Sequence, residues 1–253
     1  MSRIWTGWPL RLLCRQPLEI DPSKETMLNA PLTGKRILVT QSQDFMGPAL
    51  CRLLAAQGAD VVASTEDLSA PGVAERVVQS AGHIDVLVAN LAIHAPSTPA
   101  VDVDEAEWSA VFAALVNPLP RLVRAAVPQM IARRSGKVLV MGSASALRGM
   151  KRASTYSAAR GAQLAYVQAL GVEMAPHNVQ VNAIAQNFVD NPTYFPPEVQ
   201  ANPRFQERLA REVPLGRLVS PDEDASMAAY LCSPAADCFV GQVFPVCGGW
   251  AVR

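Results

Sequence analysis

The stretch KRILVTQSQDFMGPALCRLLAAQGADVVA, from Lys35 to Ala63, decides the fold. It opens with an apolar, β-branched run at residues 36–40, which is the form expected of a strand buried on both faces. After a polar turn, apolar residues recur at helical spacing from Gly47 to Gln57, and Gly58 ends this helix. Residues 59–63 restart a strand. A strand, a helix and a second strand in this order predict two parallel strands joined by a right-handed crossover.

The rest of the chain continues this alternation. Further strands are predicted at residues 84–89, 137–141, 179–184 and 242–246, and further helices at residues 73–80, 105–115, 121–133, 155–175, 198–211 and 221–233. The pattern predicts a doubly wound parallel α/β sheet, a Rossmann-like three-layer α/β/α single domain. Binding loops lie at the carboxyl edge of such a sheet, so functional residues are expected after residues 40, 89, 141 and 184.

Composition limits the class of protein. The chain has 253 residues, of which 50% are hydrophobic and 17% charged, enough for one packed domain and too apolar for a disordered chain. Lys+Arg and Asp+Glu both count 22, so no net charge drives binding to nucleic acid or to a membrane surface. No apolar run of about 18 residues predicts a membrane span. Five scattered cysteines without a CxxC pair indicate reduced thiols in the cytoplasm, and the three separated histidines predict no metal site.

Residues 1–32 show no clear period, and we interpret them as an N-terminal extension outside the core fold. The short apolar stretch near Trp8 is interrupted by Arg11 and has no small-residue cleavage site, which argues against a signal peptide. An alternative is that Met27 is the natural start. Residues 33–253 are then the Rossmann-like catalytic domain.

The turn after the first strand reads TQSQDFMG, Thr40 to Gly47. In a dinucleotide-binding turn, glycines permit a tight bend and let backbone N–H groups approach the pyrophosphate. Gln41 and Phe45 stand where the short-chain dehydrogenase pattern TGxxxGxG has its first two glycines, and a phenylalanine side chain projects into the space that phosphates need. The acidic residue expected further on has only Glu66 as a candidate, and residues 40–90 are about one βα unit too short for an adenosine pocket. The sequence predicts a Rossmann frame without a nucleotide cofactor.

Three side chains have the spacing of a catalytic site. Ser143 follows the strand predicted at 137–141, Tyr156 comes thirteen residues later, and Arg160 lies one helical turn beyond Tyr156. A guanidinium near a phenol favours the phenolate, and a serine hydroxyl can hold a substrate oxygen beside it. A core tyrosine with a surface arginine is the alternative, and for an isolated YxxxR it is the better interpretation. The serine at the end of a strand favours catalysis instead.

Ser143, Tyr156 and Arg160 resemble the Ser-Tyr-Arg triad of halohydrin dehalogenases, relatives of the short-chain dehydrogenases/reductases that have arginine where those enzymes have lysine. Thr40, Phe45 and Gly47 match the altered first turn of that family, and the resemblance extends over residues 35–250. It implies conversion of vicinal haloalcohols to epoxides with release of halide and a proton. It also implies the reverse opening of epoxides by small anions such as azide, cyanide or nitrite, without nucleotide or metal, in a homotetramer.

The resemblance also implies a halide site. Asn187, Phe188 and Val189 would supply backbone N–H groups, Phe45 and Phe195 an apolar wall, and Gln186 would stand next to them in the halide-binding loop. Members of the family often have proline where Gln186 stands and tyrosine at position 188 or 195. Both differences affect the shape of the predicted pocket.

Two other functions remain open from the sequence. One is an NAD(P)-dependent short-chain oxidoreductase, in which the loop after residue 184 would be a mobile substrate lid. The other is a non-catalytic Rossmann-like regulator that binds small ligands. An intact set of Ser143, Tyr156 and Arg160 argues against the regulator, which has no need of an activated phenol.

Overall fold

The computed structural model describes residues 31–252 and contains one six-stranded parallel sheet. Its strands run in the order β2-β1-β3-β4-β5-β6, and every pair of neighbours is parallel. The bounds are β1 Arg36–Val39, β2 Asp60–Ala63, β3 Val86–Asn90, β4 Gly136–Ser143, β5 Val179–Gln186 and β6 Val243–Val246. The predicted fold class is confirmed.

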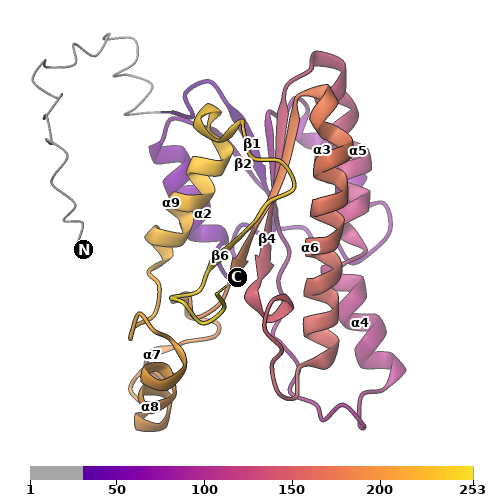
Figure 1. The fold of residues 1–253 in the computed structure, drawn as a ribbon. Helices are drawn as coiled ribbons and strands as arrows, with labels where there is room; N and C mark the ends of the chain where they lie inside the picture. The colour runs from indigo at the N-terminus through magenta and orange to yellow at the C-terminus, as the bar shows by residue number, and fades with distance from the viewer. Residues whose placement is uncertain (1–30, 253) are drawn as a thin grey trace, which may run out of the picture.

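Helices cover both faces of the sheet (Figure 1). Helices α2 and α9 pack on one face, whereas α3, α5 and α6 pack on the other, with α4 against α6. Helices α7 and α8 lie beyond the carboxyl ends of the strands. The bounds are α2 Gly47–Ala56, α3 Val73–Ala81, α4 Glu105–Leu115, α5 Pro118–Arg133, α6 Ser154–Met174, α7 Pro197–Gln200, α8 Pro203–Glu212 and α9 Pro221–Cys232.

The alternation of side chains along each strand builds two apolar cores. Ile37 and Val39 belong to the core beneath α2 and α9, whereas Leu38 belongs to the core beneath α3, α5 and α6. All three are fully buried. The continuous apolar run of β1 is therefore explained by burial on both faces.

The sheet has one strand, β2, outside β1, whereas the usual dinucleotide-binding order places two there. The described residues between β1 and β3 supply only one strand and two helices. This confirms the prediction that the segment is one βα unit short.

Most predicted segments differ from the structure by three residues or fewer at their ends, but two predictions are wrong in kind. The helix expected at 198–211 is two helices, α7 and α8, because the residue before a proline disfavours helical backbone and Pro203 begins the second helix. Asn202 adopts extended backbone there and caps α8, accepting a hydrogen bond from the Arg204 N–H at 3.0 Å. Leu32, placed in the extension, is fully buried in the core and donates its N–H to the Gln57 carbonyl at 3.1 Å. The extension at residues 1–30 lies outside the described residues.

Residues Glu105–Arg133 form a helical stretch that, by length and composition alone, could cross a membrane. In the fold this stretch is divided at Val116 and Asn117 into α4 and α5. Leu115, Leu119 and Leu122 within it are fully or almost fully buried in the protein. The apolar character of the stretch is thus accounted for, at least in part, by the core of the domain.

Candidate active site

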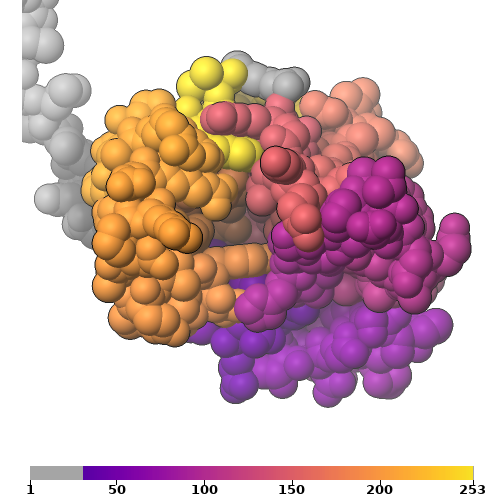
Figure 2. All heavy atoms as spheres, turned by 90° about the horizontal axis from the view of Figure 1, so that it is seen from below, coloured from indigo at the N-terminus to yellow at the C-terminus, as the bar shows by residue number. Residues whose placement is uncertain are grey.

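A cavity of about 300 Å³ opens at the carboxyl edge of the sheet. From this side the surface is hollowed between the segment of α7 and α8, in orange, and the magenta and pink segments opposite (Figure 2). The cavity is lined by every site residue that the sequence predicts: Phe45, Ser143, Tyr156, Arg160, Gln186, Asn187, Phe188, Val189 and Phe195. Four separate segments of the chain therefore meet where the topology predicts a binding site.

Ser143 and Tyr156 are both buried on the wall of this cavity. Ser143 is the last residue of β4, and Tyr156 lies in the first turn of α6. The Ser143 Oγ lies 2.9 Å from the Ser145 Oγ and accepts the Ser145 N–H at 3.2 Å. These two contacts hold the Ser143 Oγ in place on the cavity wall.

Arg160 is held beneath Tyr156 by protein acceptors. Its Nη1 donates to the carbonyls of Leu91 and Met141, at 2.8 and 3.1 Å, and to the Gln163 Oε1 at 2.9 Å. The Cζ atom lies 5.0 Å from the centroid of the Tyr156 ring. The Nε atom is buried without a partner among the described residues. The structure thus places a fixed positive charge against the tyrosine ring.

Tyr194 is a cavity residue that the sequence interpretation did not select. Its hydroxyl donates to the Ile93 carbonyl, and its ring lies 5.4 Å from that of Phe45. Burial raises the pKa of Tyr194 far above its usual range, the neighbouring Tyr156 raises it further, and Arg160 acts in the opposite direction. The aromatic loop after residue 192 was the available signal, but the pattern does not show which of its rings faces the cavity.

The first turn is filled by side chains in place of glycines. Gln41 and Phe45 adopt left-handed backbone, with φ of 44° and 50°. The Gln41 Oε1 accepts the Ala92 N–H at 2.6 Å, and the Asn90 Nδ2 donates to the Gln41 carbonyl at 3.0 Å. Since Phe45 lines the cavity and the Gln41 side chain spans the turn, the residues present do not fit a dinucleotide pyrophosphate.

The glycine that the turn retains is explained by packing. A Cβ atom at Gly47 would lie 2.4 Å from the Gln41 carbonyl oxygen and 2.6 Å from the Ser42 carbonyl carbon. Only glycine lets α2 begin this close to the turn.

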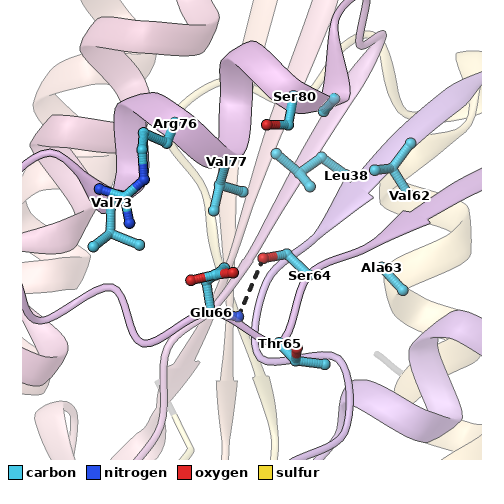
Figure 3. A pocket seen from close by; sticks show the side chains of 11 residues that line it. Leu38, Val62, Ala63, Ser64, Thr65, Glu66, Val73, Arg76, Val77 and Ser80 are labelled. Carbon is cyan, nitrogen blue, oxygen red and sulfur yellow. Dashed lines mark hydrogen bonds between the residues drawn. The ribbon is translucent and has the colours of Figure 1, made fainter.

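A second cavity, of about 330 Å³, lies between α3 and the loop that follows β2. Figure 3 shows Arg76 and Val77 of α3 facing Ser64 and Glu66 of this loop, where the Glu66 N–H donates to the Ser64 Oγ at 3.4 Å. Glu66 therefore follows β2, as an acidic residue does in dinucleotide-binding folds. No residue lines both cavities, so Glu66 is separated from the predicted chemistry.

The loop after β5 differs from its prediction in hydrogen bonding. The Asn187 N–H donates to the Val246 carbonyl at 3.1 Å, and the Phe188 N–H donates to the Asn187 Oδ1 at 2.9 Å. Pairing with β6 and a turn closed by Asn187 therefore use two of the three N–H groups expected to face a halide. The Val189 N–H has no acceptor among residues 31–252.

The Phe188 ring of this loop packs against two other aromatic rings. Phe188, with φ of 51°, stacks on Phe195 at 6.0 Å between ring centroids and lies 6.1 Å from Trp250. The Gln186 Nε2 donates to Asp224, a buried carboxyl on α9. Asp224 is another residue whose place by the site the sequence did not indicate.

Within residues 31–252, no group of three or more His, Cys, Asp or Glu side chains is arranged to hold a metal ion.

The fold and the Ser-Tyr-Arg arrangement define a Rossmann-like enzyme of the short-chain type. Residues 34–251 match a family described as enoyl-(acyl carrier protein) reductase, and the chain belongs to the short-chain dehydrogenase/reductase (SDR) family. It is 30% identical to dehydrogenase/reductase SDR family member 4 of Sus scrofa, over 88% of this chain and 89% of that protein. It is 29% identical to the 3-oxoacyl-[acyl-carrier-protein] reductase FabG of Thermotoga maritima, over 87% of this chain and 99% of that one.

Solved structures include two relatives with a different chemistry. A structure described as a dehalogenation enzyme has a TM-score of 0.82 and 31% identity, covering 87% of this chain and 100% of that chain. A halohydrin dehalogenase bound to ethyl (2S)-oxiran-2-ylacetate has a TM-score of 0.78 and 27% identity, covering 86% and 98%. The chain is thus similar both to reductases and to dehalogenases of one fold.

Proposed function

We propose that this protein is a halohydrin dehalogenase, which converts vicinal haloalcohols to epoxides without a nucleotide cofactor. The observation that carries the proposal is the meeting of Ser143, Tyr156 and Arg160 in one cavity, with Phe45 in its wall where the short-chain dehydrogenase pattern has a glycine. The similarity to a dehalogenation enzyme over its whole length supports it. The reductase similarities are of the same size in sequence, so the proposal rests on the residues of the site.

In the proposed reaction, Tyr156 as phenolate accepts the proton of the substrate hydroxyl, while the Ser143 hydroxyl donates a hydrogen bond to the same oxygen. The resulting alkoxide attacks the neighbouring carbon from the side opposite the halogen. The new C–O bond forms as the carbon–halogen bond breaks, and the halide leaves with the electron pair. Because both reacting groups belong to one molecule, holding them in line removes most of the entropic barrier.

In the reverse direction, a small anion attacks an epoxide carbon and Tyr156 returns the proton to the opening oxygen. Arg160 supplies the fixed positive charge beside Tyr156 throughout. We also propose that this positive charge favours the phenolate form of Tyr156.

The test is release of acid and halide from bromoethanol in buffer that contains no nucleotide. Tyr156→Phe, which removes only the proton acceptor, should lower the rate by about a hundredfold or more while the melting temperature stays within a few degrees. Retention of most of the rate by a folded Tyr156→Phe protein would remove Tyr156 from the reaction. Turnover of alcohols or ketones that depends on NADPH or NADP, with no halide release, would establish the oxidoreductase instead.

A further inference from the structure

The cavity carries a second arginine that the proposed reaction does not use. Arg208 of α8 lines the cavity, and its side chain keeps 47% of its surface exposed. Arg160 and Arg208 are the only charged side chains among the described residues that line this space. The cavity is therefore electrostatically suited to a ligand with negative charge.

The two arginines differ in the donors that they leave for a ligand. Arg160 is buried, and its Nη1 is engaged by three protein acceptors. Arg208 uses its Nε alone, which lies 3.3 Å from the Glu212 Oε2. Neither terminal nitrogen of Arg208 has an acceptor among residues 31–252. The free pair is the part of a guanidinium that binds a carboxylate with two parallel hydrogen bonds.

Contacts on α8 and the β5 loop fix the position of this guanidinium. Its Cζ lies 5.4 Å from the centroid of the buried Phe188 ring, next to the predicted anion loop. A guanidinium over an aromatic ring keeps the donors at its edge available. Arg208 thus combines an apolar support with unused donors.

Glu212 does not cancel the positive charge. The Arg211 Nη2 also lies 3.1 Å from a Glu212 oxygen, so one carboxylate is shared by two arginines. Burial acts to raise the pKa of Glu212, but the hydrogen bonds and charges of Arg211 and Arg208 outweigh it and lower the pKa. The group of three side chains therefore retains a net positive charge at neutral pH.

We propose that Arg208 makes this cavity selective for haloalcohols and epoxides that carry a carboxylate. The inference rests on the proposed function, since it names the substrate class of that same site. The planar pair of terminal donors matches the two oxygens of a carboxylate, whereas a spherical halide has no second oxygen to form a parallel hydrogen bond. Phe188 and Phe195 then contact the carbon chain between the carboxylate and the reacting carbons.

The first arm of the test compares turnover of γ-chloro-β-hydroxybutyrate with that of its neutral amide. The unchanged enzyme should have a kcat/KM about tenfold or more higher for the carboxylate, and Arg208→Gln should lower this ratio by about tenfold. The ratio for Arg208→Lys should lie between the ratios of the unchanged enzyme and of Arg208→Gln, because a lysine keeps the positive charge but lacks the planar pair of donors. A ratio of one or less in the unchanged enzyme, or a ratio that Arg208→Gln leaves unaltered, overturns the proposal.

Arg211→Gln is the matched control. Arg211 lies on the same helix and contacts the same Glu212, but it does not line the cavity. This variant should leave the ratio unchanged. An equal fall in both variants would assign the effect to the surface charge of α8 and would overturn the role of Arg208.

The second arm measures binding without turnover. β-Hydroxybutyrate, which has no halogen, should bind to the protein more tightly than its amide in a calorimetric titration, and Arg208→Gln should abolish the difference. If this holds and no haloalcohol is turned over, the carboxylate site stands and the proposed function fails. If amides are turned over and the carboxylate has no advantage, the proposed function stands and the role of Arg208 fails.

The third arm separates the substrate carboxylate from the departing anion. Bromide should inhibit turnover of the amide equally in the unchanged enzyme and in Arg208→Gln. A tenfold or greater weakening of bromide inhibition in the variant, roughly as large as its effect on the carboxylate, would assign Arg208 to the halide and overturn the proposal.

Discussion

Asp224 offers a test of the structure that does not depend on knowing the reaction. It is 0% exposed; its Oδ2 accepts the hydrogen bond from Gln186, and its Oδ1 is buried without a partner among the described residues. Burial raises the pKa of this carboxyl from 3.8 to about 7, with the Gln186 hydrogen bond opposing the rise. A folded state that resists ionisation must become less stable when the carboxyl is forced to ionise.

In the unfolded chain the same carboxyl ionises near its ordinary pKa. Between about pH 4 and pH 7 the unfolded state releases a proton that the folded state keeps, so the free energy of unfolding falls as pH rises. Each pKa unit corresponds to about 1.4 kcal/mol, and the rise at Asp224 corresponds to roughly 4 kcal/mol. This loss of stability is absent below about pH 4 and fully present above about pH 7.

Asp224→Asn keeps the size of the side chain and removes the ionisation. The free energy of unfolding of the variant, relative to that of the unchanged protein, should therefore rise by up to roughly 4 kcal/mol between about pH 4 and pH 8. Urea denaturation at a series of pH values measures this as a growing difference in the free energy of unfolding at constant m-value.

Asp222→Asn is the control, because Asp222 lies on the same helix but is exposed and pairs with Arg52. Its stability should follow that of the unchanged protein within about 1 kcal/mol at each pH. If the Asp224→Asn curve also runs parallel to the unchanged protein, then burial does not hold this carboxyl protonated and the reasoning fails.

Three further predictions address the site. Arg160→Lys should lower kcat at least about tenfold and the free energy of unfolding by about 2 kcal/mol, because an ammonium group cannot reach all three acceptors of Arg160. Turnover and urea denaturation measure the two effects, and unchanged values would show that these hydrogen bonds do not hold Arg160 in place. Gly47→Ala should destabilise the protein by about 1–3 kcal/mol, since its Cβ would clash with the Gln41 carbonyl; a melting temperature within a degree of the original would contradict the close approach. NADPH should give no saturable thermal shift, because Gln41 and Phe45 fill the turn. A ligand at 100 times its Kd would raise the free energy of unfolding by about 2.7 kcal/mol, so binding would be visible as a higher melting temperature.

The sequence allowed the sheet, and the meeting of Ser143, Tyr156 and Arg160 in one cavity, to be predicted for different reasons. Strands such as β1 are buried on both faces, so they leave continuous apolar runs that mark them directly. Ser143, Tyr156 and Arg160 lie at the end of a strand and on one helical turn, so their spacing alone brings them to one place. Both signals are local in the chain.

The features that escaped prediction depend on long-range contacts. Asp224 stands in a run with Asp222 and Glu223 that is typical of the exposed first turn of a helix, and only the packing of α9 turns it inward. The Asn187 N–H is used by Val246, a partner far away in sequence. The hydrogen-bonding state of a loop cannot be derived from its composition, since it depends on the strand beside it.

The left-handed backbone at Phe45 has a consequence for how this protein can change. A bulky residue in that conformation costs on the order of 1 kcal/mol, a strain that glycine would relieve. The glycine would add a similar conformational entropy to the unfolded chain, which cancels this gain, and it would also remove the packing of the half-buried Phe45 ring against Tyr194 and His94. The exchange therefore lowers stability. Most substitutions that create a new activity begin with a loss of stability. Laboratory evolution that starts here and selects for nucleotide binding would meet such a loss at its first step, because the same ring that occupies the phosphate space packs against Tyr194.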